Sequence, residues 1–440
     1  MKVKAQRQLQ SYFTLESKDT PHPQVAKSFR RNFLVNGLDL IFWHFGDSFV
    51  SVDTILPVFV STITTSPVVI GMVRAIWNAG WFMPQLFLAP SVEKKSRQLP
   101  TVLVLGALER LPYLVLGFAI LWLPSLDPGA AVAFFMALYV WKSFAAGMVA
   151  LPWQEMIAKV IPVSRRGRFI GYANLVGRAM GVLGGIVAGV VLKRYAYPQN
   201  YAVLFFIAFV VITISWGFLA MNKEPEIKKE PTGLEKQPPY LERLKGIMRS
   251  NSNFRKYLIS RGLCYIGNMA YGFVAVYAIQ RFNLPDTYAA VFTVILFGGG
   301  IIGFAIWGGL GDRIGHKRVL VLSTLVWIMG LLLLGFTSSL TWIYIIFGLM
   351  SIASTGNMVG DFNIAMEFGP ESERPTYIGL ARTLTGPILL LAPIAAGLIV
   401  KGWGYTAMFN VSLVFVIAGF VLLTLNVEDP RKLSPEVPPL

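Results

Sequence analysis

Long apolar runs alternate with short polar segments along the chain, and most runs have about 20 residues or more. A helix of this length crosses the hydrocarbon layer with its backbone groups bonded internally, whereas barrel strands alternate apolar and polar residues over about ten positions. The chain lacks that alternation. The pattern predicts an all-α membrane protein with twelve transmembrane helices at 33–60, 68–91, 100–123, 130–157, 168–192, 201–221, 255–280, 287–310, 318–336, 341–366, 376–400 and 404–425.

The polar segments between the runs suggest how the chain is divided. We expect a tail at 1–32, a six-helix bundle at 33–221, a linker at 222–254, a second bundle at 255–425 and a tail at 426–440. The linker is rich in Pro, Lys and Glu, which predicts a flexible segment that ends in a short surface helix at about Tyr240–Arg249. The first tail has no apolar core, so we do not interpret it as a signal peptide.

An internal repeat relates the two bundles. Pro162–Ala173 reads PVSRRGRFIGYA, and Pro370–Ala381 reads PESERPTYIGLA, with six of twelve positions identical and Phe169 matched by Tyr377. Weaker matches relate the first span to the seventh. Parallel six-helix repeats around an axis along the membrane normal are one way to build a carrier. The repeat therefore predicts two pseudo-symmetric bundles.

The distribution of charge predicts the orientation. The chain is 55% hydrophobic and 14% charged, with a net charge of +16. Most Lys and Arg residues fall in the tails, the linker and the loops on the same side, whereas Lys193, Arg194, Arg281 and Lys401 fall on the other side. By the positive-inside rule, both termini lie in the cytoplasm and the chain crosses the cytoplasmic (plasma or inner) membrane. This bias explains the positive charge without a nucleic-acid partner.

One cytoplasmic loop carries a family resemblance. Gly308–Arg318 reads GGLGDRIGHKR, which resembles the signature that the major facilitator superfamily carries between helices 8 and 9. The spacing of Glu367, Pro370 and Arg374 resembles a second signature of that family. The resemblance implies the twelve-helix fold of that family, alternating-access transport, and a cavity lined by helices 1, 4, 7 and 10.

We expect the same loops to form a conformational latch that closes the cytoplasmic side. Glycines permit a tight turn, and Asp312 is expected to face the positive N-terminus of span 5. Arg313 and Lys317 are expected to pair with Glu371 or Glu373. The alternative is an ordinary basic loop. The latch candidates are Gly308, Asp312, Arg313, Gly315, Lys317, Arg166, Glu367 and Arg374.

Polar residues within the spans predict the transport site, because a charge at the bilayer centre costs about 2.5–3.5 kcal/mol unless it faces protein or water. Stripes at helical spacing predict a central polar cavity for a small organic solute. The cavity candidates are Asn36, Trp43, Arg74, Asn78, Trp81, Gln85, Lys142, Arg178, Arg261, Tyr265, Asn268, Asn357 and Asp361.

Three carboxylates within the spans are candidates for proton coupling. Loss of hydration favours the neutral form of a carboxyl group, which makes Asp47 the leading candidate for exchanging a proton in each cycle. Asp39 and Glu109 are the others, and Lys142 and Arg178 are expected at a similar depth to Asp47. The alternative is a static network of buried ion pairs that holds the first bundle together.

The sequence favours a secondary carrier over other classes. It has no cluster of metal ligands, no phosphate-binding loop and no catalytic cluster, so we expect no cofactor, no metal and no enzyme activity. We expect a proton-coupled carrier of a small organic solute, monomeric in the lipid bilayer. Export of amphipathic compounds and a non-transporting receptor or sensor on the same fold remain alternatives.

Overall fold

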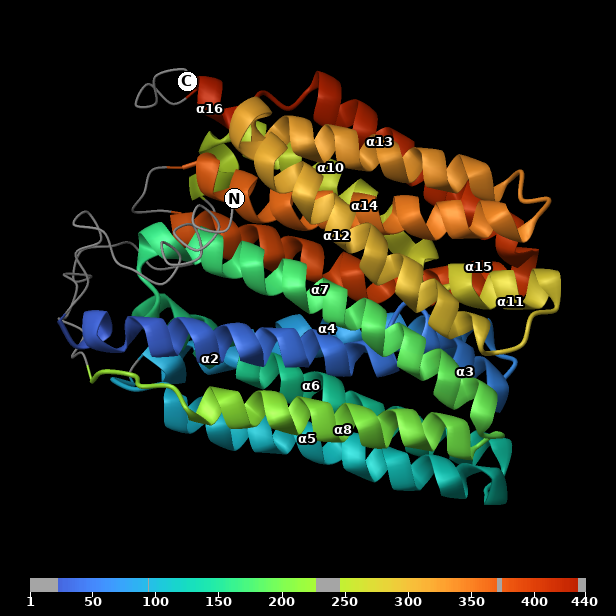
Figure 1. Ribbon diagram of the computed structural model, residues 1–440. Helices are drawn as coiled ribbons and strands as arrows, with labels where there is room; N and C mark the ends of the chain where they lie inside the picture. Colours follow the sequence, from blue (N-terminus) through green and yellow to red (C-terminus); the bar gives the residue numbers. More distant parts are fainter. Residues whose placement is uncertain (1–22, 94, 227–245, 370–373, 434–440) are drawn as a thin grey trace, which may run out of the picture. The chain divides into compact units, whose positions relative to one another are not determined.

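The computed structural model describes residues 23–93, 95–226, 246–369 and 374–433, and all of its regular elements are helical (Figure 1). The chain divides into two compact units. The first comprises the residues up to Val50 together with Gly80–Thr232, and the second comprises Ser51–Ala79 and the residues from Gly233. The end of span 1 and the start of span 2 therefore belong to the second unit, whereas the sequence repeat would place them in the first.

In the first unit, α5 packs against α6 and α8, and α2 packs against α7 and α8. Figure 1 shows α5 and α8 side by side along their lengths. The unit consists of α2 Pro23–Asp47, η1 Ser48–Val50, the second part of α4 Pro67–Glu93, α5 Leu99–Trp122, η2 Leu123–Ser125, α6 Pro128–Val160, α7 Val163–Arg194 and α8 Gln199–Ala220.

In the second unit, α10 packs against α15, and α14 packs against α12 and α13. The short α3 contacts α11 and α12. The unit consists of α3 Ile55–Ile63, the first part of α4, α10 Ser252–Gly267, η4 Asn268–Gly272, α11 Val274–Phe282, α12 Tyr288–Ile314, α13 His316–Leu334, α14 Leu340–Glu367, α15 Arg374–Leu425 and α16 Pro430–Leu433.

Each of the twelve predicted spans coincides with a helix or with a pair of helices in sequence. Among the described residues, ten helical segments are long and apolar enough to cross a membrane. That number leaves out α4 and counts α15 once, although α15 contains the last two predicted spans and breaks at Gly404, where φ is 81°. The helices are therefore consistent with the predicted twelve.

Spans 1 and 7 are interrupted at corresponding places. A 3₁₀ turn, η1, follows α2, and another, η4, follows α10. Gly46–Asp47 ends α2 directly before the first break, and Gly267–Asn268 spans the junction of α10 with the second. Such residues favour turns over helix interiors. The repeat seen in the sequence is therefore also present in the local structure.

Aromatic side chains of the repeat occupy corresponding core clusters. In the first unit, Phe33 contacts Phe169 edge-to-face, with ring centres 5.4 Å apart. In the second unit, Phe254 contacts both Tyr257 and Tyr377, at 6.1 and 4.8 Å. Phe169 and Tyr377 are the matched positions of the repeated loop motif. Because each one is buried against the start of its bundle, the repeat is partly a packing requirement.

Glycines let α7 approach α2 closely in the first unit. A Cβ atom at Gly177 would lie 2.5 Å from the His44 ring, and one at Gly184 would overlap Ser48 Oγ. Neither position has room for a side chain. This close contact fixes α2, which carries Asp39 and Asp47, against α7, which carries Arg178.

We expect Gly184→Val to lower the apparent melting temperature of the protein in detergent, since overpacking a tight contact costs about 1–3 kcal/mol. Gly171→Val on the same helix is the matched control, because a Cβ atom at Gly171 has no atom within 4 Å. The buried thiol of Cys264 reports unfolding through its reaction with a thiol-specific dye. Equal melting temperatures for the two variants would contradict the close helix contact.

Candidate functional site

The carboxylate of Asp39 joins three helices of the first unit. Its Oδ1 atom accepts a hydrogen bond of 2.6 Å from Ser215 Oγ of α8, and its Oδ2 atom accepts one of 3.3 Å from Trp153 Nε1 of α6. The side chain is buried. Two neutral donors on α6 and α8 thus solvate this coupling candidate.

Asp47, at the end of α2, lies in the electric field of groups from three other helices. The charges that act on it are those of Lys142 on α6, Arg178 on α7 and Glu109 on α5. The Lys142 ammonium lies 5.3 Å from the ring centre of Tyr113, and a cation–π contact stabilises a buried cation. The charges of the two cations that the sequence predicted at a similar depth thus act on the leading carboxylate.

Glu109 is held directly by its neighbour in sequence. Arg110 Nη1 lies 2.7 Å from Glu109 Oε2 and donates a 2.9 Å hydrogen bond to the Gly106 carbonyl. Arg110 Nε donates a 3.3 Å bond to the Ile212 carbonyl of α8. This pair ties α5 to α8, which is the geometry expected for a static ion pair.

The predicted cavity residues Asn36, Trp43, Trp81 and Gln85 make local contacts in the first unit. The Asn36 amide exchanges hydrogen bonds with Asn222 at 2.6 and 3.1 Å, and Gln85 Nε2 donates a 2.5 Å bond to the Trp81 carbonyl. The Trp43 ring contacts His44 edge-to-face, with centres 5.4 Å apart. Asn36 thus anchors the segment that follows α8.

In the second unit, the polar stripes of spans 7 and 10 meet. Arg261 of α10 pairs with Asp361 of α14 through two contacts of 2.7 Å, Nε to Oδ1 and Nη2 to Oδ2. Tyr265 OH donates a 2.7 Å hydrogen bond to Asp361 Oδ2, and Arg261 Nη2 donates one of 3.2 Å to Asn357 Oδ1. Four predicted cavity residues therefore form one cluster. Asn268 begins η4 beyond it.

The structure adds Tyr257 and Ser323 to this cluster. Tyr257 OH donates a 3.2 Å hydrogen bond to Asp361 Oδ1, and Ser323 Oγ of α13 donates one of 3.3 Å to Asn357 Oδ1. Tyr257 lies four residues before Arg261, which is one helical turn. The helical spacing of the predicted polar stripe could therefore have identified Tyr257 as a further member. Ser323 is one of many small polar residues on an apolar span and gives no comparable signal.

Arg74 and Asn78 contact other parts of the second unit. Arg74 forms an ion pair with Asp53, and its guanidinium lies 5.7 Å from the ring centre of Tyr271. Asn78 Nδ2 donates a 2.8 Å hydrogen bond to the Leu389 carbonyl of α15. These contacts bind the ends of spans 1 and 2 to helices of the second half.

The latch candidates divide into separate roles. Gly315 directly follows α12 with φ at 90°, a backbone conformation that glycine adopts without steric cost. Gly308 is exposed on α12. Arg313 is exposed, and Lys317 Nζ donates a 3.3 Å hydrogen bond to the Thr424 carbonyl. Arg166 donates to the Ile161 and Ala158 carbonyls at the end of α6. The expected partners Glu371 and Glu373 and the side chains of Asp312 and Arg374 lie outside the described residues.

Glu367 belongs to an ion-pair cluster within the second unit, which we call the second clasp (His316, Glu367 and Arg431). Glu367 Oε1 accepts a 2.8 Å bond from Arg431 Nε and lies 2.6 Å from His316 Nδ1. The cluster joins the end of α14, the start of α13 and the segment that follows α15. Among the described contacts, the partners of this latch candidate thus come from its own half.

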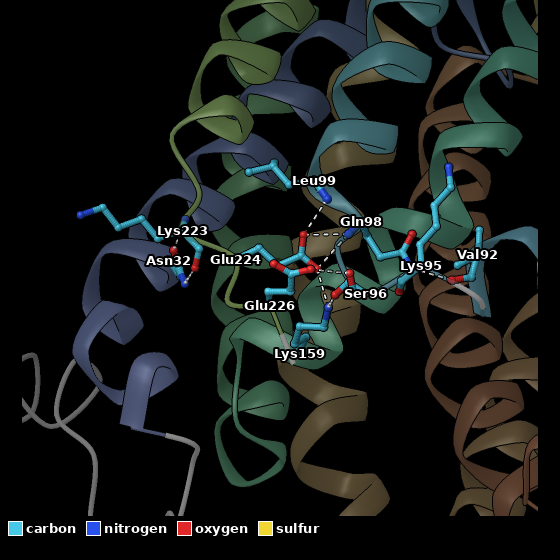
Figure 2. A network of polar contacts seen from close by, with 10 residues as sticks. All are labelled: Asn32, Val92, Lys95, Ser96, Gln98, Leu99, Lys159, Lys223, Glu224 and Glu226. Carbon is cyan, nitrogen blue, oxygen red and sulfur yellow. Dashed lines mark hydrogen bonds and ion pairs between the residues drawn. The ribbon is translucent and has the colours of Figure 1, made fainter. Parts of the chain in front are cut away.

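A corresponding cluster in the first unit, the first clasp, consists of Gln98, Leu99, Lys159 and Glu224 (Figure 2). Glu224 Oε2 accepts bonds of 2.8 and 2.7 Å from the backbone N–H groups of Gln98 and Leu99, and Lys159 Nζ lies 2.7 Å from Glu224 Oε1. The carboxylate satisfies donors of the first turn of α5, where Gln98 makes no side-chain cap. It joins the end of α6, the start of α5 and the segment after α8.

The first clasp corrects the expectation that the linker is flexible from Asn222 onwards. Besides Glu224, Lys223 is held by Asn32, whose side chain exchanges two 2.9 Å hydrogen bonds with its backbone (Figure 2). The start of the linker is therefore bound to its bundle. The composition alone gave no sign of this, because Lys, Glu and Pro are also typical of unbound segments. Residues 227–245 lie outside the described residues.

Comparison with known proteins shows which family has this architecture. The family model described as Major Facilitator Superfamily matches residues 257–439. The chain is similar over 91% of its length to a D-xylose-proton symporter, of which 98% is covered, with 14% identity and a TM-score of 0.67. A mutant of the nucleoside transporter NupG gives 14% identity, coverage of 90% and 97%, and a TM-score of 0.65. Residues 257–439, somewhat less than half of the chain, match this family, and the whole chain has the fold of these transporters.

A bacterial homologue of the iron transporter ferroportin, in its inward-facing state, is also similar, with 16% identity, coverage of 90% of this chain and 98% of that one, and a TM-score of 0.61. No curated protein sequence matches the chain. The fold and the ten long apolar helices of the described residues indicate a multi-pass membrane protein, and the family match of the second half supports a transporter. In the described part of the chain, no group of three or more His, Cys, Asp or Glu residues could hold a metal ion.

Replacing Glu224 with Gln is expected to lower the apparent melting temperature, because removal of one member of a buried, hydrogen-bonded ion pair costs about 3–5 kcal/mol. Glu226→Gln is the matched control, since Glu226 is exposed and makes one 3.1 Å bond with Ser96. The change is measured by dye labelling of Cys264 during heating.

A double-mutant cycle with Lys159→Met checks the pairing. The two changes together should destabilise the protein less than the sum of their separate effects, because the double variant leaves no unpaired cation. Strict additivity would show that Lys159 and Glu224 are not coupled.

Proposed function

We propose that the chain is a proton-coupled carrier of a small polar organic solute, working by alternating access in the cytoplasmic membrane with both termini in the cytoplasm. The observation that supports coupling is the position of Asp47 in the field of Lys142 and Arg178, with the three side chains contributed by three different helices. A proton on Asp47 removes the negative charge that both cations face. Their mutual repulsion then increases inside a region of low dielectric constant.

This change links proton binding to conformation. When Asp47 is charged, its attraction favours the arrangement in which α2, α6 and α7 are close. When Asp47 is neutral, that arrangement loses its attraction and an alternative packing becomes more populated. Differential stability of two arrangements is what a proton must supply to drive a carrier.

The nature of the solute is supported by the polar residues of the second half. Arg261, Tyr265, Asn357 and Asp361 form a polar cluster in spans 7 and 10, where a water-soluble molecule would find donors and acceptors. Two structural relatives, a nucleoside transporter and a D-xylose-proton symporter, are named for polar organic solutes. The orientation rests on the excess of Lys and Arg in the loops of one side.

Asp47→Asn is expected to abolish uphill transport. Purified protein in liposomes, given an inside-alkaline or inside-acid gradient and screened against pools of labelled sugars, nucleosides and organic acids, should accumulate a solute from one pool. In Asp47→Asn the accumulation should fall to the level without a gradient, while exchange of labelled for unlabelled solute continues. Exchange needs no net proton movement, which separates loss of coupling from loss of the site.

Asp127→Asn is the control, since Asp127 is exposed at the start of α6 and Asn also caps helices well. Accumulation that survives in Asp47→Asn and disappears in Glu109→Gln would move the coupling role to α5. Saturable binding without flux in any pool would identify a sensor on a carrier fold.

A further inference from the structure

Arg261 is a buried cation whose charge is balanced by one carboxylate. Its relative exposure is 1%, and its two contacts of 2.7 Å with Asp361 are charge-assisted. An arginine side chain stays protonated in proteins. If Asp361 loses its charge or moves away, the guanidinium therefore needs another anion, because an isolated buried charge is strongly disfavoured.

The cluster has spare capacity for such an anion. Among the described residues, the Arg261 Nη1 group is buried and has no hydrogen-bond acceptor, although a guanidinium has five N–H donors. The side chain of Asp361 is 20% exposed while that of Arg261 is 1% exposed, so Asp361 is the more accessible member of the pair. The exposed member of the pair is thus the one that an incoming anion would replace.

We infer that the solute is an organic anion whose carboxylate binds Arg261 in place of Asp361. This inference rests on the proposed transport function and names its substrate class. Tyr257, Tyr265 and Asn357, which now surround the ion pair, would provide hydrogen-bonding groups for the bound carboxylate and for Asp361. A planar guanidinium can match a carboxylate through two parallel N–H bonds, whereas Arg261 now donates one hydrogen bond to Asp361, from Nη2, and contacts its second oxygen through Nε.

The charges of this exchange balance when the anion arrives with a proton. Before binding, the charges of Arg261 and Asp361 cancel one another. After binding, the solute carboxylate pairs with Arg261 and a proton taken from water neutralises Asp361, so the net charge of the surroundings, Arg382 included, is unchanged. One anion and one proton would therefore enter the site together, and binding would be stronger at acidic pH.

The groups that face Asp361 belong to several helices. From α10 come Arg261, Tyr257, Tyr265 and the thiol of Cys264, which lies close to Arg261. From α15 comes Arg382, whose charge acts on Tyr265, and from α13 comes the Ser323 hydroxyl through Asn357. The negative charge in this group is that of Asp361 itself, which makes it the partner for a proton that accompanies the anion.

The test measures ligand-induced stabilisation of the full chain in detergent through its intrinsic tryptophan fluorescence. The probes are a pool of small monocarboxylates and a matched pool of neutral sugars and nucleosides, each applied at pH 5.5 and pH 8. We expect the monocarboxylates to stabilise the wild type, more strongly at pH 5.5. The apparent affinity should fall at least about 30-fold in Arg261→Gln.

Two variants keep the test valid if Arg261→Gln is poorly folded. Asp361→Asn should bind the monocarboxylates equally at both pH values, because the competing carboxylate is gone. The double variant Arg261→Gln with Asp361→Asn removes both charges of the pair and should fold but not respond. Arg281→Gln, at an exposed arginine at the end of α11, should behave like the wild type.

Stabilisation by the neutral pool, unchanged in Arg261→Gln, would overturn the inference while leaving proton-coupled transport intact. A pH dependence that persists in Asp361→Asn would overturn the role of Asp361 as the competing anion. By contrast, the proposed function itself fails if no pool gives gradient-driven flux in liposomes, whichever pool stabilises the protein.

Discussion

Burial of charge in an apolar environment is the constraint on which the polar interior of this protein depends. Both units meet it with an arginine–carboxylate pair, and the first also solvates a carboxylate with neutral donors. In the first, Glu109 is bound by its neighbour Arg110, and Asp39 is solvated by hydroxyl and indole donors. In the second, Arg261 and Asp361 neutralise one another. Because ions inside a membrane protein are costly without such partners, their positions determine which helices must stay together and which contacts a transport cycle can change.

The fold was largely predictable because it depends on repeated local signals. Apolar runs of the correct length locate the helices, and the doubled loop motif indicates two related halves. Breaks within helices were harder to predict. The 3₁₀ turns after Asp47 and Gly267 and the turn at Gly404 interrupt runs that remain apolar, so hydropathy passes over them. The short sequences Gly46–Asp47 and Gly267–Asn268 were the available signals for the first two.

Side-chain partners were predictable where helical spacing brings them onto one face. Tyr265 follows Arg261 by four residues, and Asn357 precedes Asp361 by four, so each pair was visible in the sequence. That the two pairs meet depends on the packing of α10 and α14, which spacing does not determine. The same limit applies to Asn36, whose partner Asn222 is 186 residues away. An amide expected to face a cavity instead binds a segment that looked like a free linker.

The two clasps have opposite polarity. In the first half the cation Lys159 ends α6 and the anion Glu224 follows α8, whereas in the second half the anion Glu367 ends α14 and the cation Arg431 follows α15. Two halves with similar helices run the risk of exchanging equivalent segments while the chain folds. If the segment after α8 docked on the second bundle, Glu224 would meet Glu367, and the reverse exchange would place Arg431 against Lys159. The inverted charges therefore favour docking of each segment on its own half, because exchange of the two segments would bring like charges together.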